Sequence, residues 1–176
     1  TPVFQNIPEG IALDYQVKMN PVVNKVDITG NNFYKTDDLL KLVNITPGSV
    51  LNNIQAGQAI SAINNKYSSA GYILSRVTSS RLDEAGVLHL GISEGHLEDV
   101  IVKGNTKTKT KVITRELIIK KGALFNKDLA RRSVERVYNT GFFEDVNVRL
   151  LPGQLNKNDV IMEIDVTEQK TGSITI

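Results

Sequence analysis

Apolar and polar side chains alternate over two stretches near the C-terminal end of the chain. Residues 146–150 and 160–166 carry an apolar side chain at every second position, which is the pattern of half-buried strands. The segment between them, 151–158, is rich in turn-forming residues and predicts a hairpin connection. A shorter alternating stretch, Val100 to Val102, ends at Gly104 and predicts a further strand.

Two helices are expected between the strand at 100–102 and the strand at 146–150. Thr108 to Thr110 can cap a helix that carries apolar residues as far as 118 and stops near Gly122. Asn126 is the N-cap candidate of a second helix, whose apolar residues recur at near-helical spacing until Gly141.

The first half of the chain shows the same order of elements. A strand at 26–28 is followed by a helix starting near Thr36, a helix after Asn53, a strand at 72–80 and a strand at 88–92. The residues that its helices are expected to bury are Leu39, Leu40, Val43, Ile54, Ile60, Ile63 and Tyr67.

An internal repeat relates the two halves at an offset of 74 residues. Gly30-Asn31 recurs as Gly104-Asn105, and the end of the last strand, 92–94, recurs at 166–168. The Tyr67–Gly71 segment corresponds to Tyr138–Gly141, but the two glycines differ by only 70 positions. We therefore expect the second helix of the first copy to be about one turn longer, with the compensating residues in the 151–158 loop.

The order strand, helix, helix, strand, strand constrains the sheet. The last two strands form a hairpin, and the first strand pairs in parallel beside the last by a right-handed crossover. The predicted fold class is α+β: tandem two-layer β-α-α-β-β units, each a three-stranded mixed sheet covered by two helices. In each unit the second-to-last strand is then an open edge.

The expected boundaries are residues 22–96 for the first unit and 97–170 for the second. Alternation at Leu13, Tyr15, Val17 and Met19 resembles the last strand of a further copy, so we interpret residues 1–21 as the closing hairpin of a preceding unit. An ordinary N-terminal arm is the alternative. Residues 171–176 end in another short alternation.

Composition and charge narrow the classes of function. The chain has 176 residues, no cysteine and a net charge of +2, which excludes disulfides and thiolate chemistry and gives no strong global field. No apolar run is long enough for a spanning helix. Residues 98–176 hold 14 basic against 11 acidic side chains; a lysine cluster at 103–111 is either a solvated loop or a contact for anionic groups.

The sequence gives little support to catalysis. Only two histidines occur; His89 falls on the polar side of a strand, and His96 near Glu98 and Asp99 is more typical of a solvated turn than of a metal site. Neither a nucleophile elbow nor a phosphate-binding or dinucleotide-binding motif is present. We expect no enzyme activity, no cofactor and no metal, and no nucleic-acid binding, since no aromatic platform accompanies the lysines.

Several of these residues resemble a known family. Gly104-Asn105, Arg115-Glu116-Leu117, Gly122, Phe125-Asn126 and the run from Tyr138 to Val146 are similar to the pattern of POTRA (polypeptide-transport-associated) domains of BamA-like outer-membrane β-barrel assembly factors. The resemblance covers residues 22–170 and is looser in the first copy. It implies that residues 171–176 are the start of the first strand of a membrane barrel.

The resemblance implies a periplasmic region that receives unfolded outer-membrane β-barrel proteins and passes them to its own barrel. An open edge strand can take up an extended client as an added strand, with little sequence preference. The candidate client-binding residues are Tyr72, Ile73, Ser75, Val77, Phe143, Asp145, Asn147 and Arg149. The candidate interdomain hinge is Glu94, Gly95, His96 and Glu98, with Gly95 able to absorb the bend.

Other partners and roles remain open at this stage. Accessory subunits or periplasmic chaperones are possible partners, and the expected location is the periplasmic face of the outer membrane of a diderm bacterium, or the intermembrane space of a derived organelle. The alternatives are the POTRA region of a two-partner-secretion or related protein-translocating barrel, and a structural docking spacer for accessory subunits.

Overall fold

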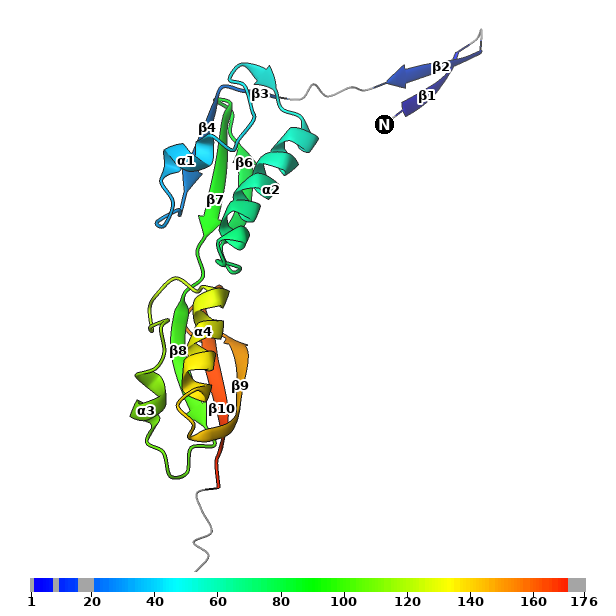
Figure 1. Cartoon of the computed structure of the whole chain (residues 1–176). Coiled ribbons are helices and arrows are strands. Elements are labelled where there is room, and N and C mark those ends of the chain that lie inside the picture. Colours follow the sequence, from blue (N-terminus) through cyan, green and yellow to red (C-terminus); the bar gives the residue numbers. More distant parts are fainter. Residues whose placement is uncertain (1, 8–9, 16–20, 171–176) are drawn as a thin grey trace, which may run out of the picture.

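The computed structural model describes residues 2–7, 10–15 and 21–170, and within them two successive α+β units follow a short hairpin (Figure 1). We call residues 22–96 the first unit and 97–170 the second unit. The hairpin consists of β1 (Pro2–Ile7) and β2 (Gly10–Tyr15), which pair antiparallel. The expected barrel strand at 171–176 lies outside the described residues.

The first unit contains a three-stranded sheet and two helices. Its elements are β3 (Val22–Val23), β4 (Lys25–Thr29), α1 (Thr36–Leu40), β5 (Ser49–Val50), α2 (Asn53–Ser69), β6 (Arg76–Leu82) and β7 (Val87–Ser93). The strand order is β4-β7-β6, with β4 parallel and β6 antiparallel to the central β7.

The second unit repeats this arrangement. Its elements are β8 (Leu97–Lys103), α3 (Thr110–Thr114), α4 (Lys127–Tyr138), β9 (Phe143–Pro152) and β10 (Val160–Glu168). The order β8-β10-β9 again has one parallel and one antiparallel neighbour of the central strand. The predicted fold class, including the central position of the last strand, is confirmed.

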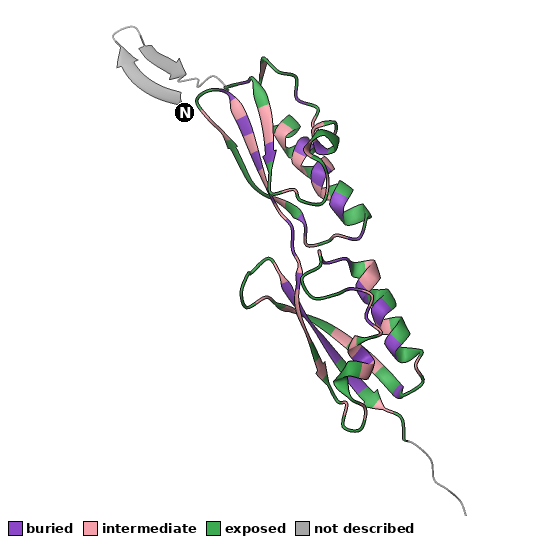
Figure 2. Ribbon diagram, turned by 90° about the vertical axis from the view of Figure 1, so that its left-hand side faces the viewer, coloured by how far each residue is buried: buried purple, intermediate pink, exposed green. Residues whose placement is uncertain are grey.

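Each unit has its own core between the sheet and its helices (Figure 2). Alternate residues of the central strands, such as Leu88 and Leu90 in β7 and Met162 and Ile164 in β10, are fully buried. The opposite face of the second sheet combines charged residues with Ile101 and Ile161, and there Glu163 is held by Lys103 and Arg149, each at 2.6 Å. Helix α2 has 17 residues and α4 has 12, which confirms the extra helical length predicted for the first copy.

Several element predictions are wrong in detail. The first helix of each unit is a single turn of five residues, so Leu117 and Ile118 lie in the loop after α3. Ile54 is exposed because it lies in the first turn of α2, beyond the edge of the core. Tyr67 is fully buried but Tyr138 is 52% exposed, and Val137 is the buried residue near the end of α4. Residues 151–152 extend β9 rather than starting the loop.

The pattern of alternation also missed a short second pairing in each unit. In the first unit β3 pairs with β5, and the Gly48 N–H donates to the Val23 carbonyl at 2.7 Å. In the second unit the Gly122 N–H donates to the Leu97 carbonyl at 2.7 Å, 74 residues further on. Two residues are too few for a periodic signal, so only the repeat itself pointed to them.

Candidate functional site: sheet edges and the junction between the units

A carboxylate at the end of each central strand anchors the loop after the first strand. Glu94 accepts hydrogen bonds from the backbone N–H groups of Asn32 and Phe33, each at 3.0 Å, and from the Tyr67 hydroxyl at 2.7 Å. Glu94 is only 8% exposed. The pKa of Tyr67 is raised, mainly because the hydroxyl is buried and secondly because it donates to the Glu94 carboxylate. Glu94 therefore belongs to the first unit rather than to a solvated turn.

Glu168 has the same role in the second unit. It accepts from the N–H groups of Lys107 and Thr108 and from the Thr106 hydroxyl, at 2.6–3.0 Å. The Thr108 N–H and the Thr106 hydroxyl lower the pKa of Glu168 to about 2. These bonds explain physically why the glutamate recurs at the repeat offset, since a carboxylate that accepts backbone N–H groups is stabilised in its charged form.

The free edge of β9 carries the clearest set of outward-facing backbone groups. The Val160 N–H donates to His96 at 2.9 Å, away from β9, so the pair Val160–Pro152 is not hydrogen bonded. By the two-residue period, Val146, Val148 and Leu150 also direct their backbone groups away from β10. Pro152 has no N–H to offer at this edge, as is typical of an edge position.

Only the middle of this edge offers open donors. The Val146 N–H already donates to the Asp145 carboxylate at 2.9 Å, and Asp145 also accepts from the Asn147 side chain at 2.7 Å. Asp145 at one end and Pro152 at the other thus bracket a window of two outward N–H groups, those of Val148 and Leu150. An added strand would pair with this window.

The corresponding edge of the first unit is partly closed. Strand β6 has seven residues and a bulge at Thr78, between Val77 and Ser79. The Val77 N–H donates to the Asn64 side chain of α2 at 2.8 Å. A bulge and a side-chain cap are two ways in which proteins make an edge less receptive to added strands, so β9 is the better candidate.

The predicted client-binding residues lie in three different settings. Tyr72, Ile73 and Ser75 precede β6 rather than lie in it, because the chain makes a turn after Gly71 in which the Ser75 N–H donates to the Tyr72 carbonyl at 3.1 Å. Phe143 is 1% exposed and belongs to the core, since the register shift between Thr167 and Glu168 turns it inward. The residues exposed on β9 as expected are Asp145, Asn147 and Arg149.

An apolar groove lies beside the open window of β9. We call it the α4–β9 groove; it has a volume of about 260 Å³. Its lining residues are Ile73, Phe125, Lys127, Ala130, Arg131, Val134, Val148 and Leu150. The sequence reasoning missed Val148 and Leu150 because it selected the odd-numbered residues of the strand, which, apart from Phe143, face away from the helices. Pro152 was the available signal. A proline in an edge strand indicates a position whose backbone nitrogen faces away from the neighbouring strand, and Val148 and Leu150 share that position in the two-residue period.

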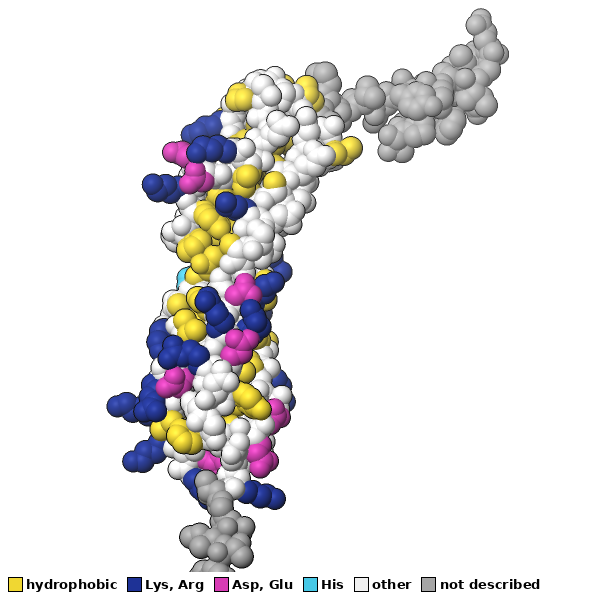
Figure 3. All heavy atoms as spheres, in the orientation of Figure 1, with side chains coloured by type: hydrophobic (Ala, Val, Ile, Leu, Met, Phe, Trp, Pro, Cys, Tyr) yellow, Lys and Arg dark blue, Asp and Glu magenta, His cyan; other side chains and the backbone are white. Residues whose placement is uncertain are grey.

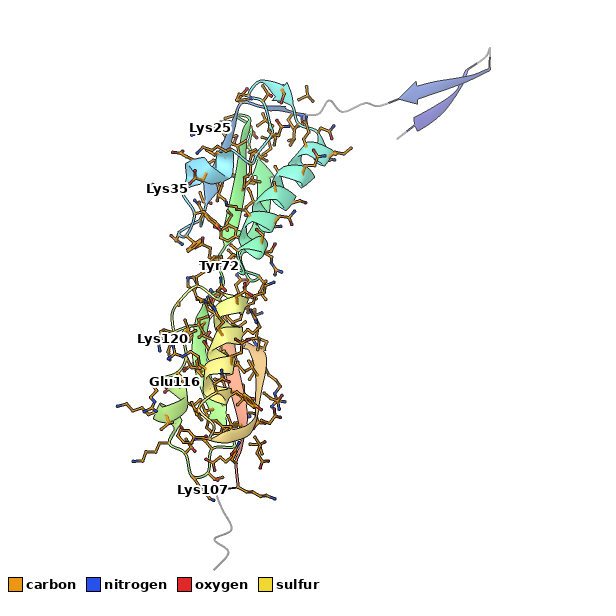
Figure 4. The ribbon with its side chains drawn as sticks, in the orientation of Figure 1. Lys25, Lys35, Tyr72, Lys107, Glu116 and Lys120 are labelled. Atoms are coloured by element: carbon orange, nitrogen blue, oxygen red, sulfur yellow. The ribbon has the colours of Figure 1, made fainter. Side chains whose placement is uncertain are left out.

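A second cavity lies at the junction of the two units. This junction cavity has a volume of about 280 Å³. It is lined by Ile73, Leu74, Arg76, Leu150, Leu151, Pro152, Lys157, Asn158, Asp159 and Val160. Ile73 and Leu150 therefore line both spaces, and in Figure 4 the neighbouring Tyr72 lies at the level of the junction.

Direct contacts join the units at this junction. Leu74 of the first unit packs against the core of the second. Asn126, the N-cap of α4, donates to the Ala70 carbonyl at 2.8 Å, and the Lys127 N–H donates to the Gly71 carbonyl at 2.9 Å. The end of α2 and the start of α4 are thus hydrogen bonded to each other.

The predicted hinge residues have specific partners. A Cβ on Gly95 would contact the Asn158 carbonyl and approach Leu74 Cβ to 2.6 Å, so this glycine is needed for close packing. The His96 N–H donates to Asp159 at 2.8 Å. Burial raises the pKa of Glu98, but the N–H groups of Leu155 and Gln154 outweigh it and hold that pKa below its usual range. Whether the joint bends in solution stays a prediction.

Charged side chains are unevenly distributed over the two units. In Figure 3, Lys and Arg side chains gather along one flank of the second unit, the flank on which Figure 4 labels Lys120. The part of the chain that the structure describes contains no group of three or more His, Asp or Glu side chains placed to hold a metal. Over the same residues, no helix combines the length and hydropathy of a membrane span.

These features define a class: tandem β-α-α-β-β units, joined by packed contacts, with an open edge strand beside an apolar groove. The family model of the POTRA domain, described as "Surface antigen variable number repeat", matches residues 21–95 and 96–169. The chain belongs to the POTRA family.

Relatives with similar sequences carry the name of outer-membrane assembly factors. A "Putative outer membrane protein assembly factor" of Treponema pallidum is 26% identical over 157 residues, 85% of this chain and 18% of the relative. "Outer membrane protein assembly factor BamA" of Neisseria meningitidis is 29% identical over 160 residues, 86% of this chain and 20% of the relative. The chain thus spans about a fifth of the length of these curated relatives.

Solved structures resemble nearly the whole chain. The N-terminal domain of Omp85 from Thermosynechococcus elongatus has a TM-score of 0.81 and 28% identity, covering 97% of this chain and 76% of that structure. POTRA1-3 of the periplasmic domain of Omp85 from Anabaena has a TM-score of 0.78 and 28% identity, covering 97% of this chain and 75% of that structure.

Proposed function

We propose that this chain is the periplasmic POTRA region of an outer-membrane protein assembly factor, and that β9 binds unfolded outer-membrane β-barrel proteins as an added strand. The names and coverage of the relatives support the first part. The observation that carries the second part is the coincidence of two outward backbone donors, on Val148 and Leu150, with the α4–β9 groove.

The chemistry of the edge fits many clients. Backbone hydrogen bonds are the same for every sequence, and an apolar groove beside them accepts alternate apolar side chains of an extended segment. Strands of a membrane barrel alternate apolar and polar residues, so each client strand offers one apolar face to the groove. The bound segment would then pass to the membrane barrel of the same polypeptide, with accessory subunits or periplasmic chaperones assisting.

The proposed location is the periplasmic face of the outer membrane, or the intermembrane space of a derived organelle. We assign residues 22–96 and 97–170 to two POTRA domains, which the family matches support to within a residue, and residues 1–21 to the closing hairpin of a preceding one. The antiparallel pairing of β1 with β2 supports that assignment. Secretion of a dedicated partner, or a purely structural spacer, has no comparable observation in its favour.

The experiment is a titration of the isotope-labelled chain with a ten-residue peptide from a barrel strand, followed by amide NMR. The expected result is a shift of the Val148 and Leu150 amides. Val148→Pro removes one outward donor without breaking the β9–β10 pairing, but it also changes a side chain of the groove. It should weaken binding about tenfold or more, and by more than Val148→Ala, which keeps the donor.

Ser80→Pro in β6 is the control, since Ser80 is exposed and, like Val148, directs its N–H away from the central strand of its sheet. It should leave the affinity unchanged. Unaltered amide signals of β10 in Val148→Pro and of β7 in Ser80→Pro would verify that each variant is folded. Strand addition at β9 is excluded if the shifts avoid β9 and Val148→Pro binds the peptide as well as the parent chain.

A further inference from the structure

Segment 72–75 is one of the places where the two copies of the repeat differ. In the second unit β9 begins at Phe143, two residues after Gly141, whereas in the first unit β6 begins at Arg76, five residues after Gly71. The additional residues form a turn at the junction. Because the second unit has no equivalent of this turn, the repeat does not account for its residues, and their contacts at the junction must.

Two residues of this turn reach the second unit, with different outcomes. Leu74 packs against the core of the second unit and so stabilises the junction. Ile73 lines the α4–β9 groove but remains 45% exposed. Across the groove, Leu150 at the open window of β9 is 42% exposed. Two large aliphatic side chains from different units thus flank one groove with their apolar surface uncovered.

We propose that the peptide-binding groove is composite: Ile73 of the first unit completes the strand-addition site on β9 of the second. The proposal rests on the proposed function, because the occupant is the same extended segment. Leu150 lies at the last open donor before Pro152, so an added strand must run past Ile73 at this end. Its apolar side chain nearest Leu150 would be covered on one side by β9 and on the other by Ile73.

The composite groove also specifies the occupant. Its floor is formed by aliphatic groups of Ala130, Val134 and Val148, and Lys127 and Arg131 of α4 contribute its basic members. Arg131 also pairs with Glu135 at 3.0 Å, but both side chains are exposed and such a pair is weak, so Lys127 and Arg131 can each serve a ligand. The groove therefore suits an extended segment with apolar residues at every second position, the last of them against Ile73, and an acidic residue beside Lys127 or Arg131.

The experiment uses the intact chain and a ten-residue barrel-strand peptide with apolar residues at alternate positions. Ile73→Asn removes the apolar wall at an exposed position, and should weaken binding roughly five- to tenfold. Ile54→Asn is the matched control, since Ile54 is an exposed isoleucine of the same unit outside both spaces, and it should leave affinity unchanged. The Ile73 methyl signal should shift when the peptide binds.

The outcomes separate the two proposals. If Val148→Pro weakens binding while Ile73→Asn does not and the Ile73 methyl signal stays in place, the composite groove is overturned and strand addition at β9 stands. If the peptide does not bind, or if its shifts avoid β9 and Val148→Pro has no effect, both proposals are overturned. Equal losses from Ile73→Asn and Ile54→Asn would also overturn the composite groove, because the effect would not be specific to its wall.

Discussion

At the scale of single residues, the repeat is explained by hydrogen bonds rather than by apolar packing. Asn31 donates to the Tyr34 carbonyl and the Thr36 hydroxyl at 2.9 and 3.0 Å, and Asn105 makes the equivalent bonds to Thr108 and Thr110 at 2.8 and 3.1 Å. Glu94 and Glu168 then close the same loops from the central strands. Loops held in this way need particular side chains, so these residues recur where many apolar positions vary.

The first prediction concerns the pH dependence of the Glu168 contact. Its pKa is lowered from 4.5 to about 2 in the folded chain, so the carboxylate stabilises the second unit above about pH 4.5 and this contribution is lost as the pH falls toward 2. An NMR titration of the Glu168 carboxyl should give a midpoint near the lower value.

Glu168→Gln should lower the urea midpoint at pH 6 by more than it does at pH 3. The exposed Glu144→Gln is the control and should show no such convergence. A titration midpoint of Glu168 at its ordinary value would contradict this account of the loop.

The second prediction concerns the buried Tyr67 hydroxyl. Tyr67→Phe removes a donor to the buried Glu94 carboxylate, and should destabilise the first unit by about 1.5–3 kcal/mol. Tyr138→Phe is the matched control, because Tyr138 is largely exposed, and a change below about 0.5 kcal/mol is expected. Chemical denaturation followed by tyrosine fluorescence measures both; equal effects would mean that the Tyr67–Glu94 bond contributes nothing specific.

At the scale of elements, the two long helices have equivalent caps with unequal surroundings. Asn52 caps α2 by accepting from the Ile54 N–H at 2.8 Å at an exposed position. Asn126, 74 residues later, caps α4 by accepting from Asp128 and Leu129, is buried, and also bonds Ala70 of the other unit. One side chain thus serves both as a helix cap and as a junction contact.

The third prediction compares the two caps. Asn52→Ala should cost about 1 kcal/mol, the ordinary value of a cap. Asn126→Ala should cost about 1.5–2.5 kcal/mol, because it also removes the hydrogen bond to the Ala70 carbonyl at the junction. Amide exchange at the end of α2 should accelerate in Asn126→Ala alone. Equal costs, with unchanged exchange at Ala70 and Gly71, would show that the junction bond is not significant.

Elements whose periodic pattern of apolar residues extends over many positions were predictable from the sequence, whereas contacts between the units were not. The alternation of apolar and polar residues over β10 and the helical spacing of apolar residues over α4 predicted the order of elements in the second unit. The 74-residue offset of the repeat then predicted the same order in the first unit. The inward turn of Phe143 follows from a register shift that no local pattern encodes. The prediction that Ile73 and Leu74 belong to a strand was wrong, because these apolar side chains contact the neighbouring unit and not the core beneath their own sheet.

At the scale of the whole molecule, the junction has the contacts of a packed interface. Leu74 packs against the second core, the ends of α2 and α4 are hydrogen bonded, and the Phe125 N–H donates to the Gly95 carbonyl at 2.9 Å. These contacts come from segments far apart in the sequence. A change of angle between the units would have to break several of them at once, so we expect a narrow range of orientations.

The last prediction tests this junction through Gly95. Gly95→Ala would force its Cβ against the Asn158 carbonyl and Leu74, and because a backbone oxygen cannot move freely, the packing of the junction must give way. The chain has no cysteine, so spin labels can be placed at Ser61→Cys on α2 and Arg132→Cys on α4, both exposed. Distances between the two labels, measured by electron spin resonance, should be narrowly distributed in the parent chain and more broadly distributed in Gly95→Ala.

Gly57→Ala is the control, since no atom lies within 4 Å of its added Cβ. This substitution should stabilise α2 by about 0.5–1 kcal/mol and leave the distance distribution narrow. A broad distribution in the parent chain would mean that the joint bends freely, and a narrow one in all three chains would mean that the close approach at Gly95 does not determine the angle.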